Sequence, residues 1–311
     1  MNSVLLYLRD SGKPASLGLI LAFLGTLLFS FKSIVVKLAY DHDIDGEQLI
    51  ALRMLISAPI YLGIFLWHQS KSPVSTVSIK RNLWTLLFAG IFGYYLASLL
   101  DLWGLELISA QLERLILFTY PGFVMLFSLV LFKKVPSKYT VLALIVTYIG
   151  IATVIGVEAR EQWQHVLKGG GLVLISAMLF ASYLILSKRG IQSLGSQVFT
   201  CLALLIASVA VALHIIIAGN VVIVGLAWQA YFWAAVMSIV CTVIPSLLIA
   251  SAIGRLGPQL TSILGGLGPV MTAGLAVLVL NETFTVYHFF GTALVVLGAW
   301  LVVFEAKSSG Q

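Results

Sequence analysis

The most constraining feature of the sequence is a series of long apolar segments that recurs from Leu17 almost to the C-terminus. A helix that crosses the ~30 Å hydrocarbon layer of a membrane needs about 20 mostly apolar residues. Hydrophobic residues make up 60% of the chain and charged residues 10%, whereas a typical soluble domain has roughly a quarter charged residues. A soluble core could not bury that much apolar surface, so the sequence predicts an all-α polytopic membrane protein.

Apolar runs bounded by charges, glycine and proline predict ten transmembrane helices with very short connections. Because so little of the chain lies outside the membrane, we expect its function to reside within the helices. The predicted helices lie near residues 16–39, 47–67, 82–107, 109–132, 137–157, 169–188, 196–218, 227–253, 257–280 and 286–304.

The basic residues predict the orientation of these helices, because cytoplasmic loops retain an excess of lysine and arginine. With the N-terminus inside, the outer loops hold only Arg160 and Lys168, together with the acidic stretch "YDHDIDGE". Both termini are then cytoplasmic, and the expected location is the bacterial inner (plasma) membrane. The cytoplasmic side collects Arg9, Lys13, Lys71, Lys80, Arg81, Lys133, Lys134, Lys138, Lys188, Arg189, Arg255 and Lys307.

Several other function classes lack a signal in the sequence. The net charge of +6 does not indicate nucleic-acid binding, because the basic residues lie in short loops rather than on one exposed patch. Cys201 and Cys241 lie in apolar segments and indicate neither a disulfide framework nor a metal site. The five histidines show no ligand spacing, and "GGLG" lacks the lysine and hydroxyl residue of a phosphate-binding loop. We therefore expect no metal, no cofactor, no catalytic residue and no nucleic-acid partner.

The chain contains an internal repeat. A shift of 148 positions aligns "SLLDLWGLELISAQL" with "SLLIASAIGRLGPQL" and Pro121 with Pro269, and a shift of 151 aligns "LLFSFKSIVVK" with "MLFASYLILSK". This many matches in register indicate duplication. Five helices per copy is an odd number, so the second repeat must cross the membrane in the opposite direction. Inverted repeats are typical of secondary transporters that hold substrate near the membrane midplane. The predicted parts are an N-terminus at 1–15, repeats at 16–157 and 169–304, an outer linker at 158–168 and a tail at 305–311.

The two five-helix halves, the matched prolines and the pattern "NETFTVYHFFGTALVVLG" resemble the drug/metabolite transporter superfamily, in particular its ten-helix EamA-type members. The resemblance covers residues 16–304. It implies transport of amino acids, other metabolites or nucleotide sugars, through a cavity lined mainly by helices 1, 3, 4, 6, 8 and 9. One departure is that the position of Glu282, commonly acidic in such proteins, is occupied in the first repeat by Lys134.

Ionisable residues in the outer half of the first repeat are the strongest candidates for a site. An ionised side chain at the centre of a bilayer costs at least ~2.5–3.5 kcal/mol on insertion scales, so several at one depth should pair or face a wet cavity. Glu106 and Glu113 are expected at the outer interface, whereas Lys32 and Asp101 lie deeper. The full set is Lys32, Arg53, Asp101, Glu106, Glu113 and Arg114.

The signs of these charges suggest a binding mode. In our hypothesis Lys32, with Arg53 or Arg114, meets an anionic group such as a carboxylate, while Asp101 or Glu113 meets an amine, carries a coupling proton or closes an outer gate. The aligned positions of the second repeat carry uncharged side chains. The sequence therefore predicts a cavity that is charged only on the side formed by the first repeat. The alternative is a set of closed salt bridges that hold helices 1 to 4 together. The other predicted binding residues are Tyr94, Tyr95, Tyr183, Ser246, Thr261 and Ser262.

Proline and glycine predict breaks near the middle of helices 4 and 9. Proline removes a backbone donor, and glycine permits close approach. Such breaks either act as hinges and expose carbonyls to the cavity, or are kinks that improve packing. The residues concerned are Pro121, Gly122, Gly265, Gly266, Gly268 and Pro269.

The predicted function is alternating-access transport, as an exporter, of a small polar metabolite such as an amino acid or a related zwitterion. The alternative substrate class is phosphorylated or nucleotide-conjugated metabolites, which three basic residues would also attract. The alternative functions outside solute transport are those of a membrane-embedded enzyme and of a lipid scramblase. The expected partners are a small solute and membrane lipids, and transport of the solute can be coupled to protons. The sequence carries no signal for a particular oligomeric state.

Overall fold

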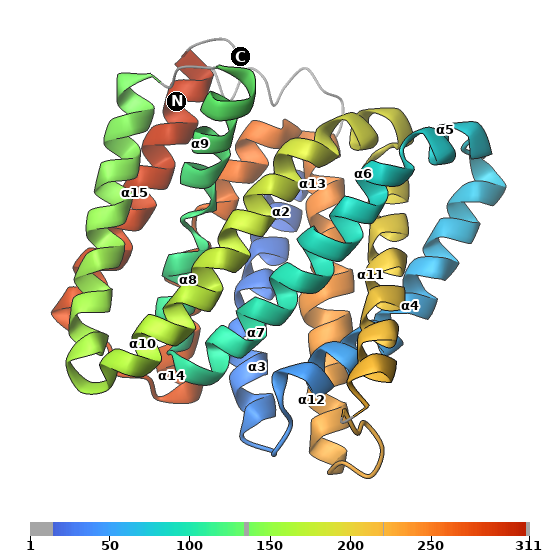
Figure 1. Cartoon of the computed structure of the whole chain (residues 1–311). Coiled ribbons are helices and arrows are strands. Elements are labelled where there is room, and N and C mark those ends of the chain that lie inside the picture. The colour runs from blue at the N-terminus through green and yellow to red at the C-terminus, as the bar shows by residue number, and fades with distance from the viewer. Residues whose placement is uncertain (1–14, 134–136, 220, 309–311) are drawn as a thin grey trace.

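The computed structural model describes residues 15–133, 137–219 and 221–308, which are helical apart from short turns and loops (Figure 1). In lipid, backbone groups must be hydrogen-bonded within the segment itself, which an α-helix achieves. The first part contains α2 (Ala15–Ser30), α3 (Lys32–Tyr40), α4 (Gly46–Lys71), α5 (Thr76–Arg81), α6 (Leu83–Phe88), the π-helical η1 (Ala89–Leu96), α7 (Ala97–Leu107), α8 (Ala110–Leu117) and α9 (Tyr120–Phe132). The chain continues with α10 (Lys138–Leu194), α11 (Ser196–Ala218), α12 (Trp228–Ser238), the π-helical η2 (Ile239–Val243), α13 (Ile244–Gly265), α14 (Gly268–Leu280) and α15 (Val286–Ser308).

Among the described residues, eight helical segments are long and apolar enough to cross a membrane, and two shorter apolar helices lie at Gly268–Leu280 and Val286–Leu301. These segments correspond to the ten predicted helices, which confirms the all-helical fold. We number them spans 1 to 10 in chain order; span 9 comprises the last turns of α13 together with α14. The eight long spans are Ser16–Tyr40, Gly46–Lys71, Leu83–Leu107, Ala110–Phe132, Lys138–Arg160, Gln162–Leu194, Ser196–Ala218 and Trp228–Ile253.

The connections differ from the prediction at two places. Predicted helices 5 and 6 form one element, α10, which departs from helical geometry at Gln162 (φ −141°, ψ 55°). The predicted linker at 158–168 is therefore helical on both sides of this kink, because its alanine, glutamate, arginine and glutamine residues are strong helix formers. Similarly, α13 runs through residues 254–256, where the sequence predicted a boundary between helices 8 and 9.

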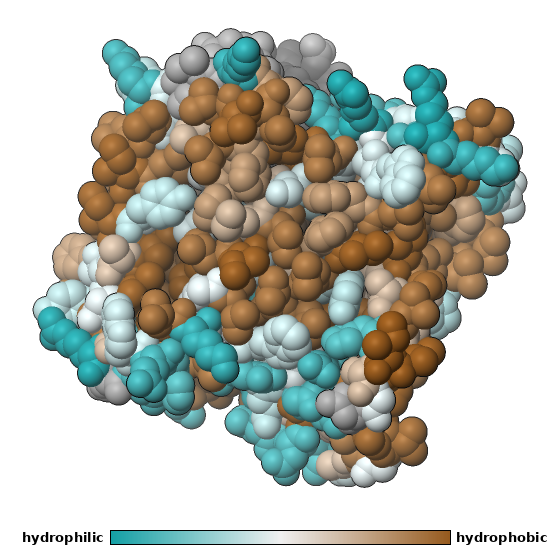
Figure 2. Space-filling view, in the orientation of Figure 1, coloured by the Kyte–Doolittle hydropathy of each residue, from teal (hydrophilic) through white to brown (hydrophobic). Residues whose placement is uncertain are grey.

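The two ends of the helix bundle differ in charge. We call one end the acidic face; it is formed by residues 41–45, 108–109 and 281–285 and lies at the bottom of Figure 1. The opposite end, the basic face, includes α5 with Lys80 and Arg81. Figure 2 shows apolar side chains across the middle of the visible side and hydrophilic residues gathered toward its upper and lower margins. This distribution matches a membrane interior between two aqueous layers.

The two parts of span 4 differ in burial, and this difference positions the candidate site. Nearly all of α8 is buried, because α8 packs against α3, α10 and α14. In α9 only Gly122 is fully buried, and side chains such as Val130 and Phe132 are exposed. The first and second halves of the chain therefore meet tightly around α8, on the acidic-face side of the membrane.

Candidate substrate site

Spans 4 and 9 are both interrupted beside their prolines. The break between α8 and α9 falls at Phe118 and Thr119, and Pro121 occupies the first turn of α9. The break between α13 and α14 falls at 266–267, and Pro269 occupies the first turn of α14. Proline suits a first helical turn because its missing N–H would have no partner there. The structure thus places a break at each predicted position, and the hinge role of these breaks stays a prediction.

The central cluster consists of Lys32, Ser33, Asp101 and Glu113, from spans 1, 3 and 4. The Lys32 ammonium forms a salt bridge with Asp101 and lies 3.9 Å from Glu113 Oε1. Ser33 Oγ donates a hydrogen bond of 2.7 Å to Glu113 Oε2. Two carboxylates therefore share one lysine, and when all three groups are ionised the cluster carries one excess negative charge.

The burial of the central cluster corrects one expectation from the sequence. Glu113 is 0% exposed and Asp101 2% exposed, while the Lys32 side chain retains 19% exposure. Glu113 is therefore not exposed at the acidic face, because Lys32 and Ser33 offer it partners inside the bundle. Glu106 does lie at the acidic face, where it accepts a hydrogen bond of 2.8 Å from the backbone N–H of Gly46.

Four polar atoms in and around the central cluster are buried without a hydrogen-bond partner among the described residues, when both carboxyl groups are ionised; the Asp101 and Glu113 side chains lie close enough to hydrogen-bond to each other once one of them is protonated. The four atoms are Asp101 Oδ1, Glu113 Oε1, Arg53 Nε and Arg114 Nε. Buried polar atoms in native proteins are nearly always satisfied, so each exception calls for a partner or a functional reason. Neither arginine forms a salt bridge with another described residue. Unsatisfied acceptors and unsatisfied donors thus occur in the same region.

The two arginines approach this region from different sides. Arg53 is 8% exposed and donates a hydrogen bond of 3.3 Å to Ser98 Oγ, one helical turn before Asp101. Arg114 lies against the start of α14, since a Cβ atom added to Gly268 would be 2.8 Å from Arg114 Nη2. Arg114 therefore reaches from the first repeat to the helix break of the second.

The remaining predicted residues form separate contacts. The hydroxyl groups of Tyr94 and Tyr183 are 3.0 Å apart, with their ring centroids 5.1 Å apart. The Tyr95 ring instead packs against His214 of α11, at 5.8 Å between centroids. The structure brings Lys32, Asp101 and Glu113 together and does not join Tyr95 to them. Ser246 Oγ lies 3.4 Å from the Tyr61 hydroxyl, Thr261 is buried, and the Ser262 side chain lies outside the described residues.

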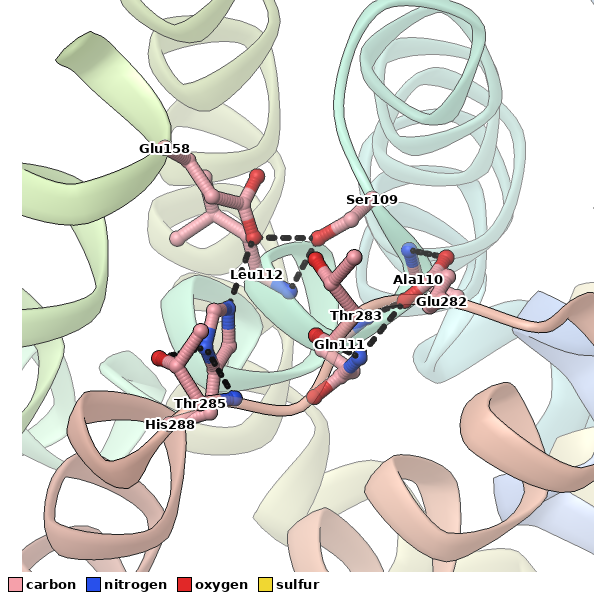
Figure 3. A network of polar contacts seen from close by, with 9 residues as sticks. All are labelled: Ser109, Ala110, Gln111, Leu112, Glu158, Glu282, Thr283, Thr285 and His288. Carbon is pink, nitrogen blue, oxygen red and sulfur yellow. Dashed lines mark hydrogen bonds and ion pairs between the residues drawn. The ribbon is translucent and has the colours of Figure 1, made fainter. Parts of the chain in front are cut away.

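A second set of polar residues, the rim network, was missed by reasoning from the sequence (Figure 3). It connects the start of α8 to the end of span 5, to the segment after α14 and to the start of α15. Two features of the sequence point to this network: Gln111 aligns with Gln259 between the repeats, and the motif "NETFTVYHFFGTALVVLG" contains the acidic residue Glu282. We define the rim network as Ser109, Gln111, Glu158, Glu282, Thr285 and His288.

Two helical halves with matched breaks and ionisable groups buried at membrane depth define the chain as a membrane transporter rather than an enzyme. The chain belongs to the EamA-like transporter family, whose model matches residues 16–156 and 167–304. Uncharacterized transporter YcbK of Bacillus subtilis is 30% identical to it over 274 residues, with 87% of each chain covered. An uncharacterized transporter of Synechocystis sp. is 25% identical, with 94% of each chain covered.

The fold is also shared with a solved crystal structure. The TM-score is 0.63 at 18% sequence identity, and the match covers 93% of this chain and 98% of the other. The likeness shows a common arrangement of helices.

Proposed function

We propose that this transporter exports a small zwitterion, an amino acid or a related amino carboxylate, by alternating access. The observation that supports this substrate class is the occurrence of unsatisfied buried acceptors and unsatisfied buried donors around Lys32. Asp101 Oδ1 and Glu113 Oε1 supply the acceptors, and Arg53 Nε and Arg114 Nε supply the donors. A zwitterion carries an ammonium group, which can donate to these acceptors, and a carboxylate, which can accept from these donors.

The carboxylate of the solute would meet Arg114 in this proposal. A guanidinium group can bind a carboxylate through two parallel hydrogen bonds, and such charge-assisted bonds are roughly twice as strong as neutral ones. Arg114 lies at the break of span 9, so this contact would join solute, first repeat and second repeat. Arg53 is the second candidate, although its Nη1 is already engaged by Ser98.

The amino group of the solute would meet the carboxylates of the central cluster. Asp101 and Glu113 share Lys32 as their nearby cation, so a second positive charge would neutralise the cluster. A proton on either carboxylate would have the same effect on charge. The solute amine and a coupling proton would therefore compete for this cluster.

The helix breaks suit a carrier in which one face opens while the other closes. We propose that the acidic face is the outer side and that both termini are cytoplasmic, in a bacterial inner membrane. The buried α8 then closes the outer side of the site, whereas α9 lies toward the cytoplasm. A cysteine in place of the exposed Asp41 tests this orientation, because a membrane-impermeant thiol reagent should label it in intact cells.

A thermal-stabilisation screen of the purified protein tests the substrate class. A ligand at 100 times its dissociation constant adds ~2.7 kcal/mol to the free energy of unfolding. We expect stabilisation by amino carboxylates and not by diamines that lack a carboxylate. Stabilisation confined to sugar phosphates or nucleotide conjugates would replace the zwitterion with the alternative substrate class.

Flux measurements then test transport itself. Proteoliposomes loaded with a stabilising solute should exchange it with labelled external solute, and the exchange should saturate. The Arg114→Lys variant provides a matched control, since it keeps the charge and loses the two-pronged geometry of the guanidinium group. Movement of labelled lipids without solute exchange would support a scramblase instead.

A further inference from the structure

We propose that Glu282 is a positioning residue that holds the acidic face closed by capping α8 from the opposite repeat. The proposal rests on the alternating-access function above. It adds a named contact that must break when this face opens. Glu282 touches neither the central cluster nor the two arginines through any contact described for it, so it would act on the site through α8.

The contact is a carboxylate at a helix N-terminus. Glu282 Oε1 accepts a hydrogen bond of 2.8 Å from the backbone N–H of Ala110, and Oε2 accepts one of 3.1 Å from Gln111 Nε2 (Figure 3). The backbone N–H of Gln111 lies 3.3 Å from Oε2. The first N–H groups of a helix have no partner within it and carry partial positive charge, so a carboxylate stabilises them.

Glu282 is fixed to the second repeat through its own backbone. α14 ends at Leu280, and the following residue, Asn281, has a φ of 53°, in the left-handed region, which turns the chain toward α8. The backbone N–H of Glu282 then donates a hydrogen bond of 3.2 Å to the carbonyl of Ala276. The cap on α8 is therefore anchored on α14, and it ties the first repeat to the second.

The same helix carries two residues of the site. Glu113 and Arg114 lie within a turn of the capped residues Ala110 and Gln111 on α8. Glu113 is completely buried while this cap is in place. Separation of α8 from Glu282 would therefore open a path to the central cluster from the acidic face.

The chemistry of the contact suits a reversible latch. The donors are backbone N–H groups at a helix end and one side-chain amide, and Glu282 itself is only partly buried, so water can replace it when α8 moves away. Hydrogen bonds exchanged for bonds to water have a modest net energy, so both states remain accessible. The central cluster differs, because its carboxylates meet a lysine ammonium, and breaking a buried ion pair costs more than exchanging a neutral hydrogen bond with water.

The chain offers a matched control at the same face. Glu106 accepts a hydrogen bond of 2.8 Å from the backbone N–H of Gly46, the first residue of α4. This is also a carboxylate at the N-terminus of a helix, with the same distance. Both Glu106 and Gly46 belong to the first repeat, so loss of this contact should not separate the repeats.

The test measures side-specific access to a cysteine near the cluster. The reporter is Ser98→Cys in a Cys201→Ser/Cys241→Ser background, and Asp41→Cys identifies the vesicle orientation in which the acidic face is accessible. We expect Glu282→Ala to raise the labelling rate from that face about tenfold, equivalent to ~1.4 kcal/mol in the opening equilibrium. Glu106→Ala should leave the rate within about twofold, and Glu282→Gln, which keeps an acceptor oxygen, should give an intermediate rate.

Three results would overturn the proposal: an unchanged rate in Glu282→Ala, an equal rise in Glu106→Ala, or a rise only from the basic face. If Glu282→Ala does not fold, the labelling rate of Glu282→Gln is measured in its place. An unchanged labelling rate in that variant refutes the proposal. Labelling requires no solute, so an incorrect substrate class leaves this test intact. A side-specific rise in a protein that transports no zwitterion would refute the proposed substrate and keep the latch.

Discussion

The central cluster and the rim network both place carboxylates between helices, yet they differ in how fully those carboxylates are satisfied. In the rim network both oxygens of Glu282 have donors. In the central cluster, ionised Asp101 and Glu113 each keep one oxygen without a hydrogen bond from any residue that the structure describes. The comparison separates two uses of buried charge: a satisfied carboxylate holds elements together, whereas an unsatisfied one can accept a further partner.

The difference follows from where each group lies along its helix. Glu282 meets the first turn of α8, where backbone N–H groups are free to donate. Asp101 of span 3 and Glu113 of span 4 contact span 1 within the bundle, where backbone donors are used in the helices themselves. Carboxylates at that depth depend on side chains, and those described are Lys32 and Ser33.

Replacement of the shared lysine should have the largest effect. In Lys32→Met, Asp101 and Glu113 lose their common cation, and breaking a buried ion pair typically costs ~3–5 kcal/mol. We expect solute exchange to disappear and the free energy of unfolding to fall by about that amount. Thermal unfolding and exchange in proteoliposomes measure the two effects.

A double variant then separates a binding cluster from a purely structural one. Lys32→Met/Asp101→Leu removes the closest ion pair as a unit, and apolar replacement of a buried pair is often close to neutral in stability. We expect recovered stability without recovered exchange. Recovery of both would show that the cluster only joins helices, which is the alternative reading of these charges.

The second largest effect should come from Arg114, which contacts both repeats. Arg114→Lys keeps the charge but loses the guanidinium geometry, and hydrogen bonds to charged groups contribute about 1.5–3 kcal/mol. We expect the KM for a zwitterion to rise roughly 10- to 100-fold, with little loss of stability because Arg114 Nε has no hydrogen-bond partner among the described residues. An unchanged KM would remove Arg114 from the binding site.

The sequence predicted the fold well and the site in part, for physical reasons. Hydropathy marks every membrane-spanning helix, because each must be apolar over its length, and the prolines mark the breaks of spans 4 and 9. The sequence placed Lys32 and Asp101 at one depth and predicted that charges there pair or face a cavity, but it did not name this ion pair. The burial of Glu113 and the cap from Glu282 were not anticipated, because both depend on how α8 packs against α3 and α14.

A methyl group added at Gly268 should disturb the contact between Arg114 and α14, with a smaller effect on the KM than Arg114→Lys has. In Gly268→Ala the new Cβ would lie 2.8 Å from Arg114 Nη2, so the flexible guanidinium must shift. We expect the KM to rise severalfold, which is less than in Arg114→Lys because the group is displaced rather than lost. Gly274→Ala on the same helix is the control, since its Cβ would meet nothing within 4 Å. Equal effects of the two changes would point to helix propensity instead of the arginine contact.

The smallest effect should come from a residue that belongs to the rim network alone. Ser109 caps α8 through a 3.0 Å bond from the Leu112 N–H and donates a 2.6 Å bond to Glu158. Loss of a serine cap costs about 0.5–2 kcal/mol, so Ser109→Ala should lower the free energy of unfolding by roughly 1 kcal/mol. Ser137→Ala, which removes the cap of α10 at the opposite face, should lower it similarly. Because Glu282 still holds α8 in Ser109→Ala, both variants should keep the KM within about twofold; a tenfold change in Ser109→Ala alone would mean that the rim network contributes to binding the solute.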